Sequence, residues 1–128
     1  MILIADDDLD FAENCSMMLE AHGYDVNVVS DGVEALKEIR QQQPELLISD
    51  CSMPNMGGLE LSKEVRARPG EAQFPVLLMS SSPKSQVAPG ISYDSFLRKP
   101  FLAEDLLLEV RKLIANHMDL TQNKKGNA

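Results

Sequence analysis

The chain has 128 residues, 44% of them hydrophobic and 25% charged, which fits one globular domain of ordinary size. Its net charge of -8 argues against nucleic acid as a direct ligand and favours basic partners or bound cations, although such charge also simply keeps small proteins soluble. No run of about 18 apolar residues could span a membrane, and no room for a signal peptide precedes the first predicted strand, so we expect a cytoplasmic protein without membrane contacts.

Short apolar runs alternate with segments of helical periodicity along the chain. The runs predict strands at residues 2–5, 24–29, 46–48, 74–79 and 93–97. The periodic segments predict helices that begin at Asp10, at the capping residue Asp31, after Gly58 and at Leu102. We expect Gly23 to end the first helix and the last helix to end near Asn116.

Two segments lack the signals of a regular helix. Residues 83–90 contain Pro83, Pro89 and Gly90, so we expect a short or irregular segment where a fourth helix would stand. The polar stretch 118–128 is expected to be a disordered tail, which leaves residues 1–117 as the only domain.

The periodicity also predicts which helical side chains are buried. The predicted stripes are Phe11, Cys15, Met18 and Leu19; Val33, Leu36 and Ile39; and Ala103, Leu107, Val110 and Ile114. Cys15 is therefore expected in the core, and with Cys51 it forms neither a disulfide framework nor a metal-binding pattern, which is typical of reduced thiols in the cytosol.

Strands that alternate with helices predict an α/β fold, with a parallel sheet covered by helices on both faces. The common small version is the doubly wound, flavodoxin-like sheet of five strands in the order 2-1-3-4-5. Ligands in such sheets bind beyond the carboxyl ends of the strands, at the point between the first and third strands where the order reverses. The polar residues that end the predicted strands should gather there; they are Asp6, Asp7, Asp50, Ser80 and Lys99.

Asp50 ends the apolar run 46–48 and precedes a loop that Pro54, Gly57 and Gly58 enforce. Taken alone, an Asp at this position could equally cap a helix or form a turn. Its meeting with the acids that follow the first strand favours a functional role instead.

Three carboxylates brought close together repel one another, and a divalent cation relieves that repulsion. A site made only of oxygens suits Mg²⁺ or Mn²⁺, whereas zinc would require a His or Cys cluster that the sequence lacks. A carboxylate beside such a cation can attack a phosphoryl group, and the Lys99 ammonium and Ser80 hydroxyl can then each stabilise a phosphoryl oxygen. The residue types therefore predict phosphoryl transfer to a carboxylate.

These motifs resemble those of response-regulator receiver domains, the CheY-like family of two-component phosphorelays. The matching segments are Ile2–Asp8, Asp31–Leu36, Asp50–Gly58, Ser80 and Lys99–Phe101, and the likeness extends over nearly the whole chain up to the tail. The resemblance implies that Asp50 is phosphorylated by a histidine kinase or phosphotransfer protein. It also implies that Asp7 binds Mg²⁺ directly, that Asp6 holds metal-bound water and that the Ser52 backbone carbonyl completes the ligands. Asp8 has a weaker claim and could be only a solvated neighbour.

The resemblance further implies a switch, in which Ser80 moves toward the phosphoryl group and an aromatic residue on the fifth strand turns inward. That residue is Phe96, where many relatives have Tyr, so a hydroxyl contact is missing and an ordinary core role for Phe96 stays open. We expect a single-domain response regulator that is a phospho-acceptor rather than an enzyme, beyond its own phosphorylation and dephosphorylation, and that signals through protein contacts without binding DNA.

Two other functions remain open. A haloacid-dehalogenase-like phosphatase also forms an aspartyl phosphate, but it needs a second Asp two residues after the nucleophile, where this chain has Ser52. A degenerate receiver that binds a partner without phosphorylation is the other alternative, against which the complete set of acidic, Ser and Lys residues argues.

Overall fold

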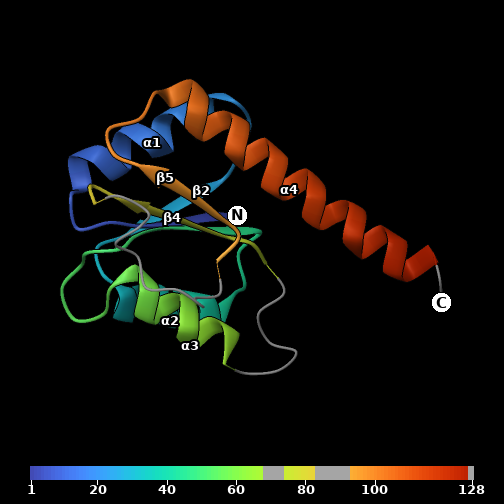
Figure 1. Cartoon of the computed structure of the whole chain (residues 1–128), viewed down its shortest axis with the longest axis horizontal. Helices are drawn as coiled ribbons and strands as arrows, with labels where there is room; N and C mark the ends of the chain where they lie inside the picture. Colours follow the sequence, from blue (N-terminus) through green and yellow to red (C-terminus); the bar gives the residue numbers. More distant parts are fainter. Residues whose placement is uncertain (68–73, 83–92, 127–128) are drawn as a thin grey trace.

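A computed structural model of the protein describes residues 1–67, 74–82 and 93–126, and the strands in these ranges form one parallel sheet. The strands are β1 (Ile2–Ala5), β2 (Val26–Val29), β3 (Leu46–Asp50), β4 (Val76–Ser80) and β5 (Ser95–Arg98), in the spatial order β2-β1-β3-β4-β5. The described helices are α1 (Leu9–Ala21), α2 (Gly32–Gln41), α3 (Gly58–Arg66) and α4 (Ala103–Gly126). Helices α1 and α4 cover one face of the sheet and α2 and α3 the other (Figure 1). The predicted doubly wound fold and strand order are confirmed, whereas the predicted irregular segment 83–90 lies outside the described residues.

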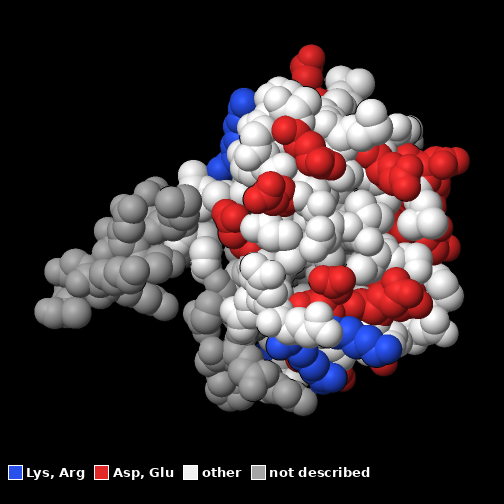
Figure 2. Space-filling model, turned by 180° about the vertical axis from the view of Figure 1, so that it is seen from behind, with Lys and Arg blue, Asp and Glu red and all other residues white. Residues whose placement is uncertain are grey.

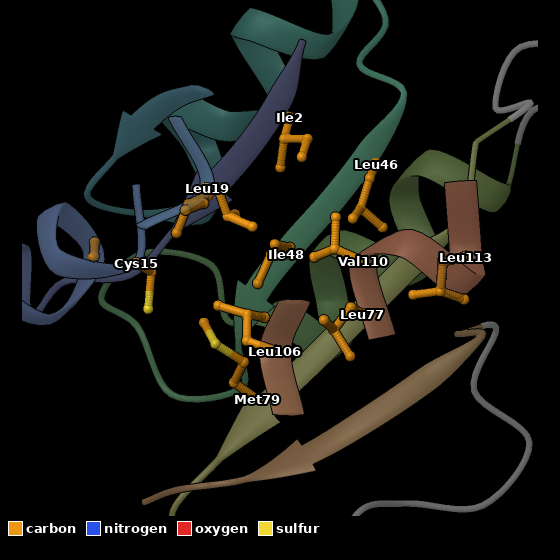
Figure 3. Close-up of a cluster of buried hydrophobic side chains, with 12 residues drawn as sticks. Ile2, Cys15, Leu19, Leu46, Ile48, Leu77, Met79, Leu106, Val110 and Leu113 are labelled. Atoms are coloured by element: carbon orange, nitrogen blue, oxygen red, sulfur yellow. The ribbon is translucent and has the colours of Figure 1, made fainter. Parts of the chain in front are cut away.

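Successive residues of each inner strand point to opposite faces of the sheet and build two separate cores. Ile2, Ile4, Leu46, Ile48, Leu77 and Met79 pack under α1 and α4, in what we call the α1/α4 core (Figure 3). Leu3, Ala5, Leu47, Val76 and Leu78 pack under α2 and α3, in the α2/α3 core. Because both faces are covered, these strands appear in the sequence as continuous apolar runs rather than alternating ones.

Two aspartates determine where the first helices begin. The Asp31 carboxylate accepts a hydrogen bond from the Glu34 backbone N–H at 2.8 Å, which confirms that Asp31 caps α2. Asp8 caps α1 in the same way, through the backbone N–H of Phe11 at 3.2 Å, so α1 begins one residue before the predicted Asp10. At the other end of α1, Gly23 adopts a φ of 92°, the left-handed conformation that ends many helices, as predicted.

The last helix departs from the sequence prediction in length and in its buried face. Helix α4 continues to Gly126 instead of ending near Asn116. The sequence holds no Gly or Pro between Pro100 and Gly126, so nothing in it stops the helix earlier. Of the predicted stripe, Val110 is buried as expected, Leu107 and Ile114 are partly buried, and Ala103 is exposed. Leu106 and Leu113, which the stripe did not include, are also buried.

Helix α2 shows a similar shift of its buried face. Val33, predicted to be buried, is 39% exposed, and Ala35 is fully buried in its place, while Ile39 is buried as predicted. Cys15 lies in the α1/α4 core, and both cysteines are free thiols. None of the helices in the described ranges is long and apolar enough to cross a membrane.

Candidate functional site

The polar residues that end the strands meet at one edge of the sheet. Asp6 directly follows β1, Asp50 is the last residue of β3, Ser80 is the last residue of β4, and Lys99 directly follows β5. Because these strands are parallel and neighbouring, their carboxyl ends lie side by side. The edge between β1 and β3 is also the point where the strand order reverses, which is where this fold class binds ligands.

Lys99 joins two of the carboxylates across this edge. Its Nζ lies 2.7 Å from Asp6 Oδ2 and 3.7 Å from Asp50 Oδ1. Burial of Lys99 favours the neutral amine, but the hydrogen bond to Asp6 and the charge of Asp50 outweigh it and raise the pKa of the ammonium above its usual value. Lys99 is therefore a firmly charged cation that Asp6 and Asp50 share.

Asp50 is buried, with 8% of its surface exposed. Its pKa is raised, first because burial disfavours the charged carboxylate and then because the charges of Asp6 and Asp7 oppose it; Lys99 and the Ser52 backbone N–H partly offset these effects. Any cation or hydrogen-bond donor that approaches Asp50 therefore stabilises the charged form of its carboxylate.

The three acids fit a divalent cation. One carboxylate oxygen from each of Asp6, Asp7 and Asp50 can be chosen so that all three lie within 4.8 Å of one another. Asp6 is fully buried and Asp7 is exposed, so the cluster opens to solvent at Asp7. A set of carboxylate oxygens at a solvent-accessible edge suits Mg²⁺, which retains several waters when it binds to proteins.

The carboxylate of Asp8, the third acid of the N-terminal run, caps helix α1 and is not part of the acidic cluster. The Asp8 backbone N–H donates to Asp6 Oδ1 at 2.9 Å. Asp6 is thereby held from both sides, by Asp8 on one oxygen and by Lys99 on the other. The signal for this role was present in the sequence, since an Asp before a helical apolar pattern is a common cap.

The loop after Asp50 folds back closely on the strand that precedes it. A Cβ added to Gly58 would lie 2.4 Å from the Asp50 carbonyl oxygen, and one added to Gly57 would lie 2.5 Å from that of Cys51. Both distances are shorter than real side chains allow, so the two glycines let the loop pass near the end of β3.

The same loop is fastened to the start of α2. The Asn55 side-chain amide donates to Asp31 Oδ2 at 3.0 Å, and the Gly32 backbone N–H donates to the Met56 carbonyl at 3.1 Å. Asn55 has a φ of 68°, a conformation that Asn tolerates better than most residues. No local sequence pattern indicates these contacts, because they join positions 24 residues apart.

Ser80 and Phe96 lie on neighbouring strands near the site. Ser80 is buried, and its Oγ accepts a hydrogen bond from the Ser82 backbone N–H at 3.0 Å. Phe96 is half-buried against the α2/α3 core, with its ring centroid 6.4 Å from that of Tyr93. Cys51, beside Asp50, has its thiol pKa raised to about 11 by burial and by the Asp50 charge, so it remains protonated at neutral pH.

Acidic side chains predominate on one face of the molecule. On the face shown in Figure 2, Asp and Glu side chains cover more area than Lys and Arg side chains, as the net charge of -8 leads one to expect.

The chain is similar in sequence to response regulators of mycobacteria. The response regulators MprA of Mycobacterium leprae and of Mycobacterium tuberculosis (strain CDC 1551 / Oshkosh) are each 36% identical to the chain over 115 residues. The aligned region covers 88% of this chain and 50% of each relative, so the chain spans about half the length of the curated relatives it matches.

Solved structures give the same result. The receiver domain of a signal transduction histidine kinase from Syntrophus aciditrophicus superposes with a TM-score of 0.83 at 32% identity, over 90% of this chain and 89% of that one. The chemotaxis protein CheY4 of Vibrio cholerae superposes with a TM-score of 0.79 at 31% identity, over 88% of this chain and 96% of that one. The family profile of the response regulator receiver domain matches residues 2–111, and the chain therefore belongs to this family.

Proposed function

We propose that this receiver domain, residues 1–117, accepts a phosphoryl group on Asp50 from a phosphohistidine of a histidine kinase or a phosphotransfer protein. Receiver domains are modules of two-component signalling and generally not enzymes. The observation that carries the proposal is the Lys99 ammonium between Asp6 and Asp50, 3.7 Å from the Asp50 carboxylate at the carboxyl edge of the sheet. A site that accepts a phosphoryl group needs this combination of a carboxylate nucleophile and a fixed cation.

The acidic cluster supplies the remaining charge compensation. Asp6, Asp7, Asp50 and the Ser52 backbone carbonyl would hold Mg²⁺, or Mn²⁺ in its place. The ion, when bound, offsets negative charge on the phosphoryl oxygens. Asp7 is the exposed member of the cluster and is therefore the residue we assign to direct contact with an incoming cation.

The chain's own residues then perform the transfer. An Asp50 carboxylate oxygen forms a bond to phosphorus as the bond between phosphorus and the donor's imidazole nitrogen breaks, and the electron pair stays with the imidazole. Lys99 holds one phosphoryl oxygen, and the Ser80 hydroxyl donates to another. Since the transferring group carries its charge on its oxygens, positioning and charge stabilisation provide most of the catalysis.

We infer that the output is a change in protein contacts in the cytoplasm. Ser80 would leave the Ser82 backbone N–H, 3.0 Å away, to reach the phosphoryl group, and Phe96 on the next strand would turn inward. Ser80→Ala should therefore still accept phosphate on Asp50 but transmit less change to Phe96. Comparison of Phe96 chemical shifts with and without beryllofluoride, in wild type and in the variant, measures this coupling; a full response in Ser80→Ala would contradict it.

The test of the proposed function is phosphorylation by a small donor. Acetyl phosphate with Mg²⁺ should add one phosphoryl group to wild type, detected by mass spectrometry, and none to Asp50→Asn. Asp10→Asn, which changes an exposed acid in the first turn of α1, is the matched control and should be labelled as wild type is. Label on Asp50→Asn would refute the assignment of Asp50. No label on wild type would instead favour a receiver that binds its partner without phosphorylation, and sustained release of phosphate from unrelated phosphomonoesters would favour a phosphatase.

A further inference from the structure

We propose that Phe11 is a positioning residue for Lys99, and that the face of its ring holds the ammonium beside Asp50. The inference rests on the proposed function, because the position of Lys99 matters for a phosphoryl group on Asp50. It concerns a residue on α1 that neither the acidic cluster nor the strand ends include.

The contact itself is a cation over an aromatic ring. Lys99 Nζ lies 4.3 Å from the centroid of the Phe11 ring. An ammonium within about 6 Å of a ring centroid is attracted by the negative face of the ring, and more strongly where water is excluded. The Lys99 side chain is only 16% exposed, so this contact operates in a largely dry environment.

Two further contacts fix the ring. The Phe101 ring meets the Phe11 ring nearly edge to face, with centroids 5.6 Å apart and an interplanar angle of 79°. The backbone of Phe11 is held at the same time, because its N–H donates to the capping carboxylate of Asp8. Both rings pack against the α1/α4 core, so the ring face toward Lys99 belongs to a rigid part of the molecule.

The chemistry of the contact suits a lysine that has to act on a third group. A lysine has a long flexible stem and a strongly hydrated ammonium, so an unsupported one is mobile. A further carboxylate would hold the ammonium but would compete with a phosphoryl oxygen for its N–H groups. An aromatic face attracts the charge without supplying a strong acceptor, and Lys99 can therefore turn an N–H toward the phosphoryl oxygen while it stays in place.

The experiment varies the ring at position 11 while its volume stays nearly constant. Wild type, Phe11→Tyr, Phe11→Leu and a protein with 3,4,5-trifluorophenylalanine at position 11 are titrated with beryllofluoride in the presence of Mg²⁺. Fluorination removes the negative electrostatic potential over the ring face but keeps the ring. We expect Phe11→Leu to raise the midpoint about fivefold and the fluorinated protein to move the same way, while Phe11→Tyr stays within about twofold of wild type.

A second readout does not depend on phosphoryl chemistry. The ε-methylene protons of Lys99, followed by NMR in lysine-labelled protein, should show an upfield ring-current shift in wild type that is lost in Phe11→Leu. The matched control is Tyr24→Leu, since Tyr24 is an aromatic residue packed against the same core beyond the other end of α1. Tyr24→Leu should leave both the Lys99 shift and the beryllofluoride midpoint unchanged.

The outcomes separate the two proposals. If the fluorinated protein binds beryllofluoride as wild type does, or if Tyr24→Leu weakens binding as much as Phe11→Leu, the positioning role of Phe11 is refuted. An unshifted Lys99 methylene in wild type also refutes it. If wild type does not bind beryllofluoride at all, the proposed function fails, while the Lys99 shift still decides whether the ring holds the ammonium.

Discussion

Removing the charge of Asp50 should stabilise the protein in the absence of divalent cations. Asp50 is buried, and its pKa is raised above the usual value, chiefly by burial and also by its acidic neighbours. A raised carboxylate pKa means that folding favours the neutral form, so the charged form destabilises the native state at neutral pH. Asp50→Asn keeps the shape of the side chain and removes that charge.

The charge–charge part of the effect follows from the distances in the cluster, and the cost of burying the charged carboxylate acts in the same direction. Asp50 lies within 4.8 Å of Asp6 and of Asp7, so each pair of unit charges repels by about 3.5 kcal/mol or more at an effective dielectric constant of about 20. Lys99, at 3.7 Å, returns about 4.5 kcal/mol of attraction to Asp50. Asp7 is exposed, and solvent further screens its repulsion of Asp50. We therefore expect Asp50→Asn to raise the free energy of unfolding by about 1–2 kcal/mol.

The assay is urea unfolding at neutral pH, with EDTA and then with Mg²⁺. In EDTA, Asp50→Asn should be the more stable protein. With Mg²⁺ the order should reverse, because an ion at about 100 times its dissociation constant stabilises wild type by about 2.7 kcal/mol and should bind the variant much more weakly.

The stability difference between Asp50→Asn and wild type depends on pH. Because the pKa of Asp50 is raised on folding, native wild type binds more protons than the unfolded chain between the ordinary Asp value and this raised value. The advantage of Asp50→Asn in EDTA should therefore shrink as the pH falls through that interval. Asp25→Asn, an exposed acid away from the cluster, is the control and should change stability by less than about 0.5 kcal/mol. A destabilised Asp50→Asn in EDTA, or equal stabilisation of both proteins by Mg²⁺, would refute the reasoning.

Three further predictions concern the surroundings of the site. Asp7→Ala should weaken Mg²⁺ binding in a metal titration with little loss of stability, whereas Asp8→Ala should lose about 1 kcal/mol of stability with its helix cap and bind Mg²⁺ nearly as before; equal metal affinities would contradict the role of Asp7. Gly32→Ala should destabilise the protein by about 1–3 kcal/mol in urea unfolding although Ala favours helices, because its Cβ would lie 2.3 Å from the Met56 carbonyl oxygen. Asn55→Ala should raise the pKa of Asp31, which the Glu34 backbone N–H and then the Asn55 amide hold below its usual value. The stability that Asp31 contributes is present above its unfolded pKa and is lost as the pH falls through the folded one, so the variant should lose it at a higher pH; an unchanged carboxyl titration by NMR would be the contrary result.

The sequence was a good guide wherever a property depends on local pattern. Strands that are covered on both faces of a sheet appear as continuous apolar runs, so the fold could be predicted. Residues that end parallel strands must share one edge of the sheet, so the proximity of Asp6, Asp50 and Lys99 could be predicted as well. The end of α4 was not predicted, because the expected end near Asn116 followed the polar composition of the residues after it, although no Gly or Pro stop lies between Pro100 and Gly126.

Contacts between distant segments were equally beyond a local pattern. Phe11 appeared only as a member of a buried helical stripe, yet its ring also contacts Lys99, 88 positions later in the chain. Asn55 appeared only as a loop residue, yet it fastens that loop to Asp31. Such contacts depend on the exact approach of two elements, which periodicity does not define.

These contacts between distant residues connect Asp50 to particular helices. Lys99 connects Asp50 to Asp6 at the end of β1 and to Phe11 in the first turn of α1, and the residues that follow it lead directly into α4. A phosphoryl group that draws Lys99 toward itself would therefore act on α1 and on the start of α4, which lie on the same face of the sheet (Figure 1). On the opposite face, the loop after Asp50 is fastened to α2 through Asn55 and Met56. The site is thus linked by direct contacts to both helical layers, and under the proposed function a cation or phosphoryl group that offsets the charge of the acidic cluster would act on both layers.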